Sequence, residues 1–239
     1  MKRLNDGHAN STKIRLPARS PACSPVSVRP LLAAALLVLT GGCANPERSR
    51  DLGNPAVPPA VTAVQVCSNC HGVDGNSVSP NFPRLAGQQA AYLNAQLENF
   101  RSHQRSDPEG FEYMWGISRK LTDAQIKGLA DYFSRQVARD NPGAAGENSH
   151  SVAAGKEIFE KGMPTKETPP CQVCHGMKAE GMANFPRLAG QHKDYLKKQL
   201  LVFRDTEGRP GTPMKQITHL LEPGEIEAVA AYLQALPAQ

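Results

Sequence analysis

The chain contains the pattern Cys-x-x-Cys-His twice, at residues 67–71 and 171–175. This pattern is typical of sites at which a c-type haem is attached. The two thiols can form thioether bonds to the two vinyl groups of one porphyrin, and the adjacent histidine then faces the iron. The candidate attachment residues are Cys67, Cys70, His71, Cys171, Cys174 and His175. The spacing therefore predicts two covalently attached haem c groups with their iron atoms.

The sequence that follows each motif is also repeated. Residues 81–88 and 184–191 both read Asn-Phe-Pro-Arg-Leu-Ala-Gly-Gln, and further matches follow at the same offset of 103. Met114 and Met214 lie at a slightly smaller offset of 100, which indicates short deletions in loops. Two copies indicate a duplicated domain, whereas a solenoid requires at least three repeats.

Apolar residues recur at helical spacing within each copy, and no segment has the alternation of a strand. We expect helices over residues 90–100, 152–161 and 61–66, and further helices that start at Thr122 and Glu222. The sequence thus predicts an all-α fold with two tandem domains, each wrapped around one haem. The predicted division is a signal peptide at 1–44, a flexible tether at 45–60, a first domain at 61–139, a linker at 140–150 and a second domain at 151–239.

The amino terminus has the features of an export signal. A basic region precedes a nine-residue apolar run at residues 31–39, which is too short to span a bilayer. The following Leu-Thr-Gly-Gly-Cys sequence is similar to a lipoprotein cleavage box, so we expect either lipidation of Cys43 or ordinary cleavage near Ala44. The remaining chain has 21 basic and 21 acidic residues, so its charge does not favour nucleic acid as a partner.

Two alternatives exist for the paired cysteines. Exported proteins often form disulfides, and a thioredoxin-like pair would need a βαβ context that the sequence lacks. A shared zinc site would have to join two pairs that each have their own histidine. Both alternatives are weaker than haem attachment.

The second axial ligand of each iron decides the chemistry. A methionine ligand gives a saturated electron carrier with a raised potential, whereas an open site permits catalysis. Met114 and Met214 are the predicted iron ligands beside His71 and His175, because they occupy equivalent positions in loop-like segments. The rivals are His103 in the first copy and the methionines 163, 177 and 182 in the second.

Residues around these ligands also repeat. The carbonyls of Pro83 and Pro186 are candidate acceptors for the second ring nitrogen of each histidine, and Arg84 and Arg187 are candidates for pairing with propionates. Tyr92 and Tyr195 either hydrogen-bond across a domain interface or pack in it. The histidines at positions 150, 192 and 219 are expected at the surface.

Together, the motifs, the repeated octapeptides and the matched methionines resemble the dihaem cytochrome c4 family, within class I cytochromes c. The resemblance covers residues 61–239. It implies two domains whose haem propionate edges lie near each other, and a periplasmic carrier, often membrane-attached, that delivers electrons to a terminal oxidase. It also implies that His71 and Met114 ligate one iron, and that His175 and Met214 ligate the other.

The leading hypothesis is therefore an electron-transfer protein and not an enzyme, with redox proteins as partners and no small-molecule substrate. An alternative is the cytochrome subunit of a flavin- or quinone-coupled oxidoreductase. A third is a peroxidase or a thiosulfate-oxidising cytochrome, which would need an open or unusual haem site.

Overall fold

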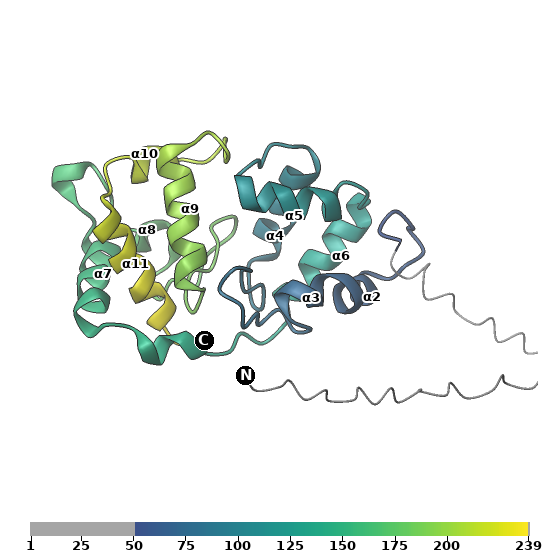
Figure 1. Cartoon of the computed structure of the whole chain (residues 1–239), viewed down its shortest axis with the longest axis horizontal. Helices are drawn as coiled ribbons and strands as arrows, with labels where there is room; N and C mark the ends of the chain where they lie inside the picture. Colours follow the sequence, from purple (N-terminus) through teal and green to yellow (C-terminus); the bar gives the residue numbers. More distant parts are fainter. Residues whose placement is uncertain (1–50, 239) are drawn as a thin grey trace, which may run out of the picture. The chain divides into compact units, whose positions relative to one another are not determined.

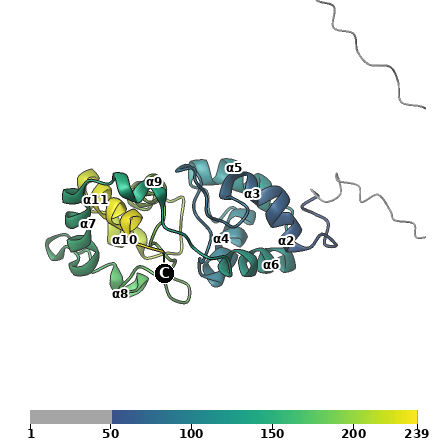
Figure 2. The ribbon, with the colours of Figure 1, turned by 90° about the horizontal axis from the view of Figure 1, so that it is seen from below.

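The described part of the chain, residues 51–238 of a computed structural model, consists of two groups of helices that correspond to the two sequence copies (Figure 1). Isolated bridges are the only β interactions within these residues, so the predicted all-α fold is confirmed. The helices of each copy group together in both views, without exchange of helices between the groups (Figures 1 and 2). The predicted signal peptide and Cys43 lie outside the described residues.

Each group is built around a short helix that carries the haem motif. The first group consists of α2 (Pro59–Thr62), the π-helix η1 (Ala63–Cys67), α3 (Ser68–His71), α4 (Ala90–Arg101), α5 (Pro108–Ser118) and α6 (Asp123–Ser134). The second consists of α7 (Ser149–Lys161), the 3-10 helix η3 (Pro164–Lys166), α8 (Gln172–His175), α9 (Lys193–Asp205), α10 (Met214–Thr218) and α11 (Pro223–Ala235). A further 3-10 helix, η2 (Pro142–Gly146), lies between the groups in the sequence.

The last helix of each group begins where the sequence predicts it. Thr122 caps α6 and Glu222 caps α11, and both caps are capping boxes closed by the residue three positions later. Each box satisfies two backbone N–H groups that a helix start otherwise leaves unpaired. These local signals fix the helices against which the motif segments pack.

The segment before the haem motif differs between the copies. In the first copy α2, η1 and α3 follow one another without interruption from Pro59 to His71. In the second copy the longer α7 is separated from α8 by residues 162–171. Each pre-haem helix packs on the last helix of its own group: α2 lies on α6, and α7 lies on α11.

Each group has its own buried core. In the first, Ala63, Leu93, Ile126, Leu129 and Phe133 form a cluster that includes part of the motif segment. In the second, the main members are Ile158, Phe159, Leu196, Val229 and Leu233. Both clusters contain a motif cysteine at their edge, Cys67 in the first and Cys171 in the second. The cores therefore hold the motifs in place.

Three details differ from the sequence-based expectations. The predicted tether at 45–60 is packed in its second half, since Val57 is buried and the Gln125 side chain donates a hydrogen bond to the Asn54 carbonyl. The predicted linker contains the helix η2 and the buried Asn141. The methionine segments are helical and not loops, because α5 contains Met114 and α10 begins at Met214.

Candidate haem sites

The two motif histidines are held in the same way. Cys67, Cys70 and His71 share one face of a helical turn, because residues three and four positions apart are neighbours on a helix. Nδ1 of His71 lies 2.8 Å from the Pro83 carbonyl oxygen, and Nδ1 of His175 lies 3.0 Å from that of Pro186. The predicted acceptors are confirmed.

These hydrogen bonds fix the tautomer of each ring. A carbonyl oxygen only accepts, so Nδ1 carries the proton and the Nε2 lone pair is available for a metal. Both rings are buried, and burial lowers the pKa of His71 and of His175, which keeps them neutral. A neutral imidazole with its second nitrogen hydrogen-bonded is the form in which histidine ligates a metal.

The first cysteine of each motif has the properties of a buried thiol. Burial raises the pKa of Cys67 and of Cys171 to about 11. All four motif cysteines are free, without a disulfide between them. Redox-active cysteines have a lowered pKa instead. The environment therefore does not favour thiol–disulfide chemistry.

A cavity of about 700 Å³ connects the two motifs with the two cores. Its walls include the cysteines and histidine of both motifs, and most of its lining surface is apolar, with side chains of both cores among it. Thiols, a neutral imidazole and an apolar wall are the groups that a covalently attached porphyrin requires. The residues of both copies therefore fit haem c.

Met114 and Met214 also line this cavity. They are anchored alike, since Ser118 Oγ donates to the Met114 carbonyl at 2.7 Å and Thr218 Oγ1 donates to the Met214 carbonyl at 2.8 Å. The rivals lie elsewhere: His103 is exposed beside Phe111 and Trp115, and the methionines 163, 177 and 182 are absent from the cavity wall. Only Met114 and Met214 among the predicted sulfur ligands reach the cavity in the described residues.

Comparisons with known proteins agree with this geometry. The cytochrome c family model matches residues 60–135 and 152–237. A cytochrome c4 of Stutzerimonas stutzeri is 37% identical over 184 residues, which cover 72% of this chain and 85% of that protein. The solved cytochrome c4 of Acidithiobacillus ferrooxidans gives a TM-score of 0.66 at 38% identity and covers 71% of this chain and 98% of that chain.

The chain belongs to the cytochrome c4 family. It is a dihaem electron carrier with two covalently attached haem c groups, one for each cysteine pair. Bound haem c supplies a one-electron Fe(III)/Fe(II) couple. A further relative is the thiosulfate dehydrogenase electron acceptor of Stutzerimonas stutzeri strain A1501, 32% identical over 205 residues that cover 84% of this chain and 90% of that protein.

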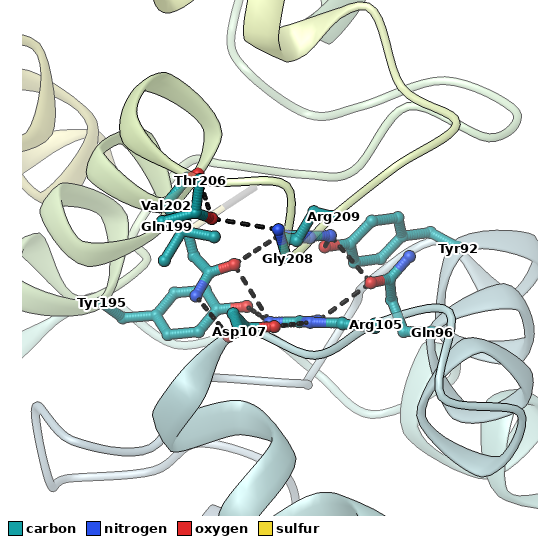
Figure 3. A network of polar contacts seen from close by, with 10 residues as sticks. All are labelled: Tyr92, Gln96, Arg105, Asp107, Tyr195, Gln199, Val202, Thr206, Gly208 and Arg209. Carbon is teal, nitrogen blue, oxygen red and sulfur yellow. Dashed lines mark hydrogen bonds and ion pairs between the residues drawn. The ribbon is translucent and has the colours of Figure 1, made fainter.

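A largely buried polar network joins the two domains of the protein (Figure 3). Arg105 of the first domain donates to Gln199 of the second at 3.0 Å, and Arg209 of the second donates to Gln96 of the first at 2.7 Å. Arg209 also donates to the Tyr92 hydroxyl at 3.2 Å. For Tyr92, a hydrogen bond across the interface was one of two alternatives, and this bond is present.

The two arginines make similar contacts with a phenylalanine ring, but they differ in their acidic partners. Arg105 lies over the Phe100 ring and Arg209 over the Phe203 ring. Only Arg105 has an acid partner in the network, Asp107, at 2.6 Å. Burial alone would raise the pKa of Asp107, but the hydrogen bond and charge of Arg105 outweigh burial and lower it. At the repeat offset of 103, Arg105 aligns with Gly208 and not with Arg209, so the motif spacing does not pair the two arginines.

Two residues make contacts that the sequence did not indicate: one was expected at the surface and the other was expected to pair with a propionate. The prediction of a surface position is wrong for His192, which is buried: Nε2–H donates to the Ser77 carbonyl at 2.9 Å, and Nδ1 accepts from Asn141 at 3.2 Å. That Arg84 pairs with a propionate stays a prediction; its guanidinium donates to Asn76 at 2.8 Å and to the carbonyls of Asp140 and Arg139. These side chains fix the linker and the domain interface.

Within residues 51–238, the helices all fall short of the length and apolar character needed to cross a membrane.

Proposed function

We propose that this cytochrome c4 carries single electrons in the periplasm between a donor complex and an acceptor such as a terminal oxidase. In this proposal His71 and Met114 ligate the first iron, and His175 and Met214 ligate the second. The observation that carries the ligand assignment is the equivalent position of both methionines on the wall of one cavity, with matched hydroxyl anchors behind them.

Saturated ligation is what an electron carrier requires. A methionine ligand raises the potential and leaves no open coordination position for a substrate. The contribution of the protein is then the orientation of the haems, their burial and the adjustment of their ligands. The alternative of an enzyme with an open haem would need one of the two methionines to lie away from the iron.

Replacement of each methionine tests the assignment. We expect Met114→Leu and Met214→Leu each to remove about half of the weak far-red band of methionine-ligated ferric haem and to lower the potential of one haem. Met177→Leu is the matched control, because Met177 is 79% exposed and absent from the cavity wall. An unchanged band in Met114→Leu would exclude Met114 as a ligand and favour a catalytic first haem.

A second proposal concerns the donor. A relative over most of the chain is named as the electron acceptor of thiosulfate dehydrogenase. A thiosulfate dehydrogenase is therefore a candidate donor, which is a different proposal from the subunit of a flavin- or quinone-coupled oxidoreductase. Stopped-flow reduction by a thiosulfate dehydrogenase with thiosulfate, compared with reduction by a quinol-oxidising complex, distinguishes the two donors.

Export and anchoring are also proposals. The basic and apolar leader supports a periplasmic location, and the sequence around Cys43 supports lipid attachment. Mass spectrometry of the amino-terminal peptide of the mature protein tests both. A diacylglyceryl group on Cys43 would establish the anchor, and an unmodified peptide that starts after residue 43 would exclude it.

A further inference from the structure

Two glutamines make a reciprocal contact between the domains. Gln191 of the second domain binds the backbone of Arg84 in the first: its Oε1 accepts from the Arg84 N–H at 2.8 Å, and its Nε2 donates to the Arg84 carbonyl at 2.9 Å. Gln88 of the first domain binds Arg187 of the second in the same way, at 2.7 and 2.9 Å. Both glutamine residues are 6% exposed. The amide groups therefore replace water at these two backbone positions.

The N–H group that donates to each glutamine belongs to the same peptide whose carbonyl orients the motif histidine. The carbonyl of the Pro83–Arg84 peptide accepts from His71, while the N–H of that same peptide donates to Gln191. The Pro186–Arg187 peptide connects His175 to Gln88 in the same way. A continuous chain of hydrogen bonds thus runs from each histidine into the other domain.

Such a chain transmits polarisation. The peptide bond is a resonance system, so a hydrogen bond accepted from its N–H places more negative charge on its carbonyl oxygen. A more negative carbonyl strengthens the hydrogen bond from histidine Nδ1 and makes the ring a more basic ligand. A more basic ligand stabilises Fe(III) and lowers the potential of the haem.

We propose that Gln191 is a positioning residue that lowers the potential of the first haem, and that Gln88 does so for the second. Each domain then sets the ligand strength of the histidine in the other domain. This inference rests on the proposed function only in taking His71 and His175 as iron ligands.

The orientation of both amides supports this role over one in which the glutamines only stabilise the domain interface. Oε1 of Gln88 also accepts from the N–H of Gln89 at 2.9 Å, and Oε1 of Gln191 accepts from that of His192 at 3.0 Å. With two N–H groups directed at each oxygen, the oxygen and nitrogen of the amide cannot exchange places. The acceptor therefore faces the peptide of the haem histidine.

The test uses Gln191→Met and Gln88→Met in the full dihaem protein, because methionine retains the length of the side chain without the amide. The two haem potentials are measured separately through assigned haem-methyl proton resonances during a redox titration. We expect Gln191→Met to raise the potential of the first haem and leave that of the second unchanged. We expect Gln88→Met to raise the potential of the second haem and leave that of the first unchanged. The Nδ1 proton resonance of the affected histidine in the Fe(II) protein should move upfield.

Gln89→Met is the matched control. It removes another hydrogen bond between the domains, from Gln89 Nε2 to the Glu180 carbonyl at 3.1 Å, but this bond involves neither histidine peptide. We expect it to move neither potential. Equal movement of both potentials in every variant would overturn the proposal and leave the glutamines as interface contacts only. A shift in the potential of the haem in the same domain as the substitution would also overturn it.

A second variant covers the case in which Gln191→Met does not fold. Gln191→Glu retains an acceptor oxygen of greater charge, so it should lower the first potential relative to the second, and a rise would refute the inference. The far-red methionine band of the wild-type protein is recorded in the same samples. Absence of this band would refute the ligand assignment. If the band is present but the potential of the haem in the other domain does not change, only the role of the glutamines is refuted.

Discussion

Gly155 allows a close contact between α7 and α11 in the second domain. A Cβ atom at this position of α7 would overlap the Ala228 carbonyl oxygen and would lie 2.8 Å from the Tyr232 Cβ, both on α11. Real Cβ atoms essentially never approach closer than 3.0 Å, so Gly155→Ala requires a separation of the two helices by about 1 Å. The nearest atom is backbone, so no side-chain rotation relieves the contact.

The sign of the stability change depends on two opposing effects. Alanine is favoured over glycine in a helix by about 1 kcal/mol. Overpacking a well-packed core costs about 1–3 kcal/mol, and the upper end applies here because two helices must move together. We therefore expect Gly155→Ala to lower the free energy of unfolding by about 2 kcal/mol.

Gly116→Ala is the matched control, because Gly116 also lies within a helix but a Cβ atom added there would have nothing within 4 Å. We expect this variant to be more stable by about 0.5–1 kcal/mol. Guanidinium unfolding of the Fe(III) protein, followed by far-UV circular dichroism and by the Soret band, measures both changes. If both substitutions stabilised the protein equally, the close contact of α7 with α11 would not exist in solution.

Two further predictions concern the domain interface. Asp107→Ala leaves the buried charge of Arg105 without its carboxylate and should lower the free energy of unfolding by about 3–5 kcal/mol. Asp205→Ala, the control at a half-exposed ion pair, should lower it by at most about 1 kcal/mol. Similar losses for the two variants in urea titrations would refute the argument from burial. For His192, burial lowers the pKa, so the unfolded chain takes up a proton first and stability falls as the pH drops below about 6.5 towards the folded-state pKa. His192→Gln should flatten the stability profile between about pH 5 and 7, and an unchanged slope would show that another group is responsible.

The sequence predicted the last helix of each domain and the haem motifs because their signals are local. Thr122 and Glu222 cap helices through bonds that reach only three residues along the chain. The Pro83 carbonyl could be identified for a related reason: a short segment with a rigid proline returns to His71 over only 12 residues. In both cases the partner lies within a short stretch of chain, so spacing alone identifies it.

The expectations that failed concern segments whose neighbours are distant in sequence. Met114 and Met214 lie among glycines and prolines and were expected in loops, but both are helical. Residues 51–60 have the composition of a tether, but Leu52 packs on the core of the first domain and Val57 is buried. Composition gives the local preference of a segment, and tertiary contacts overrode it here.

The sequence by itself determined that this protein has two covalently attached haem groups, in two helical units, because thioether attachment needs only two thiols and a histidine at fixed spacing. The tertiary structure decided which polar residues of one unit meet the other. Gln88 and Gln191 end the repeated octapeptides without a predicted contact, and His192 was expected at the surface, yet all three are buried and bonded across the interface. A buried polar side chain is stable only when its partners are in place, and here those partners are about 100 residues away in the chain.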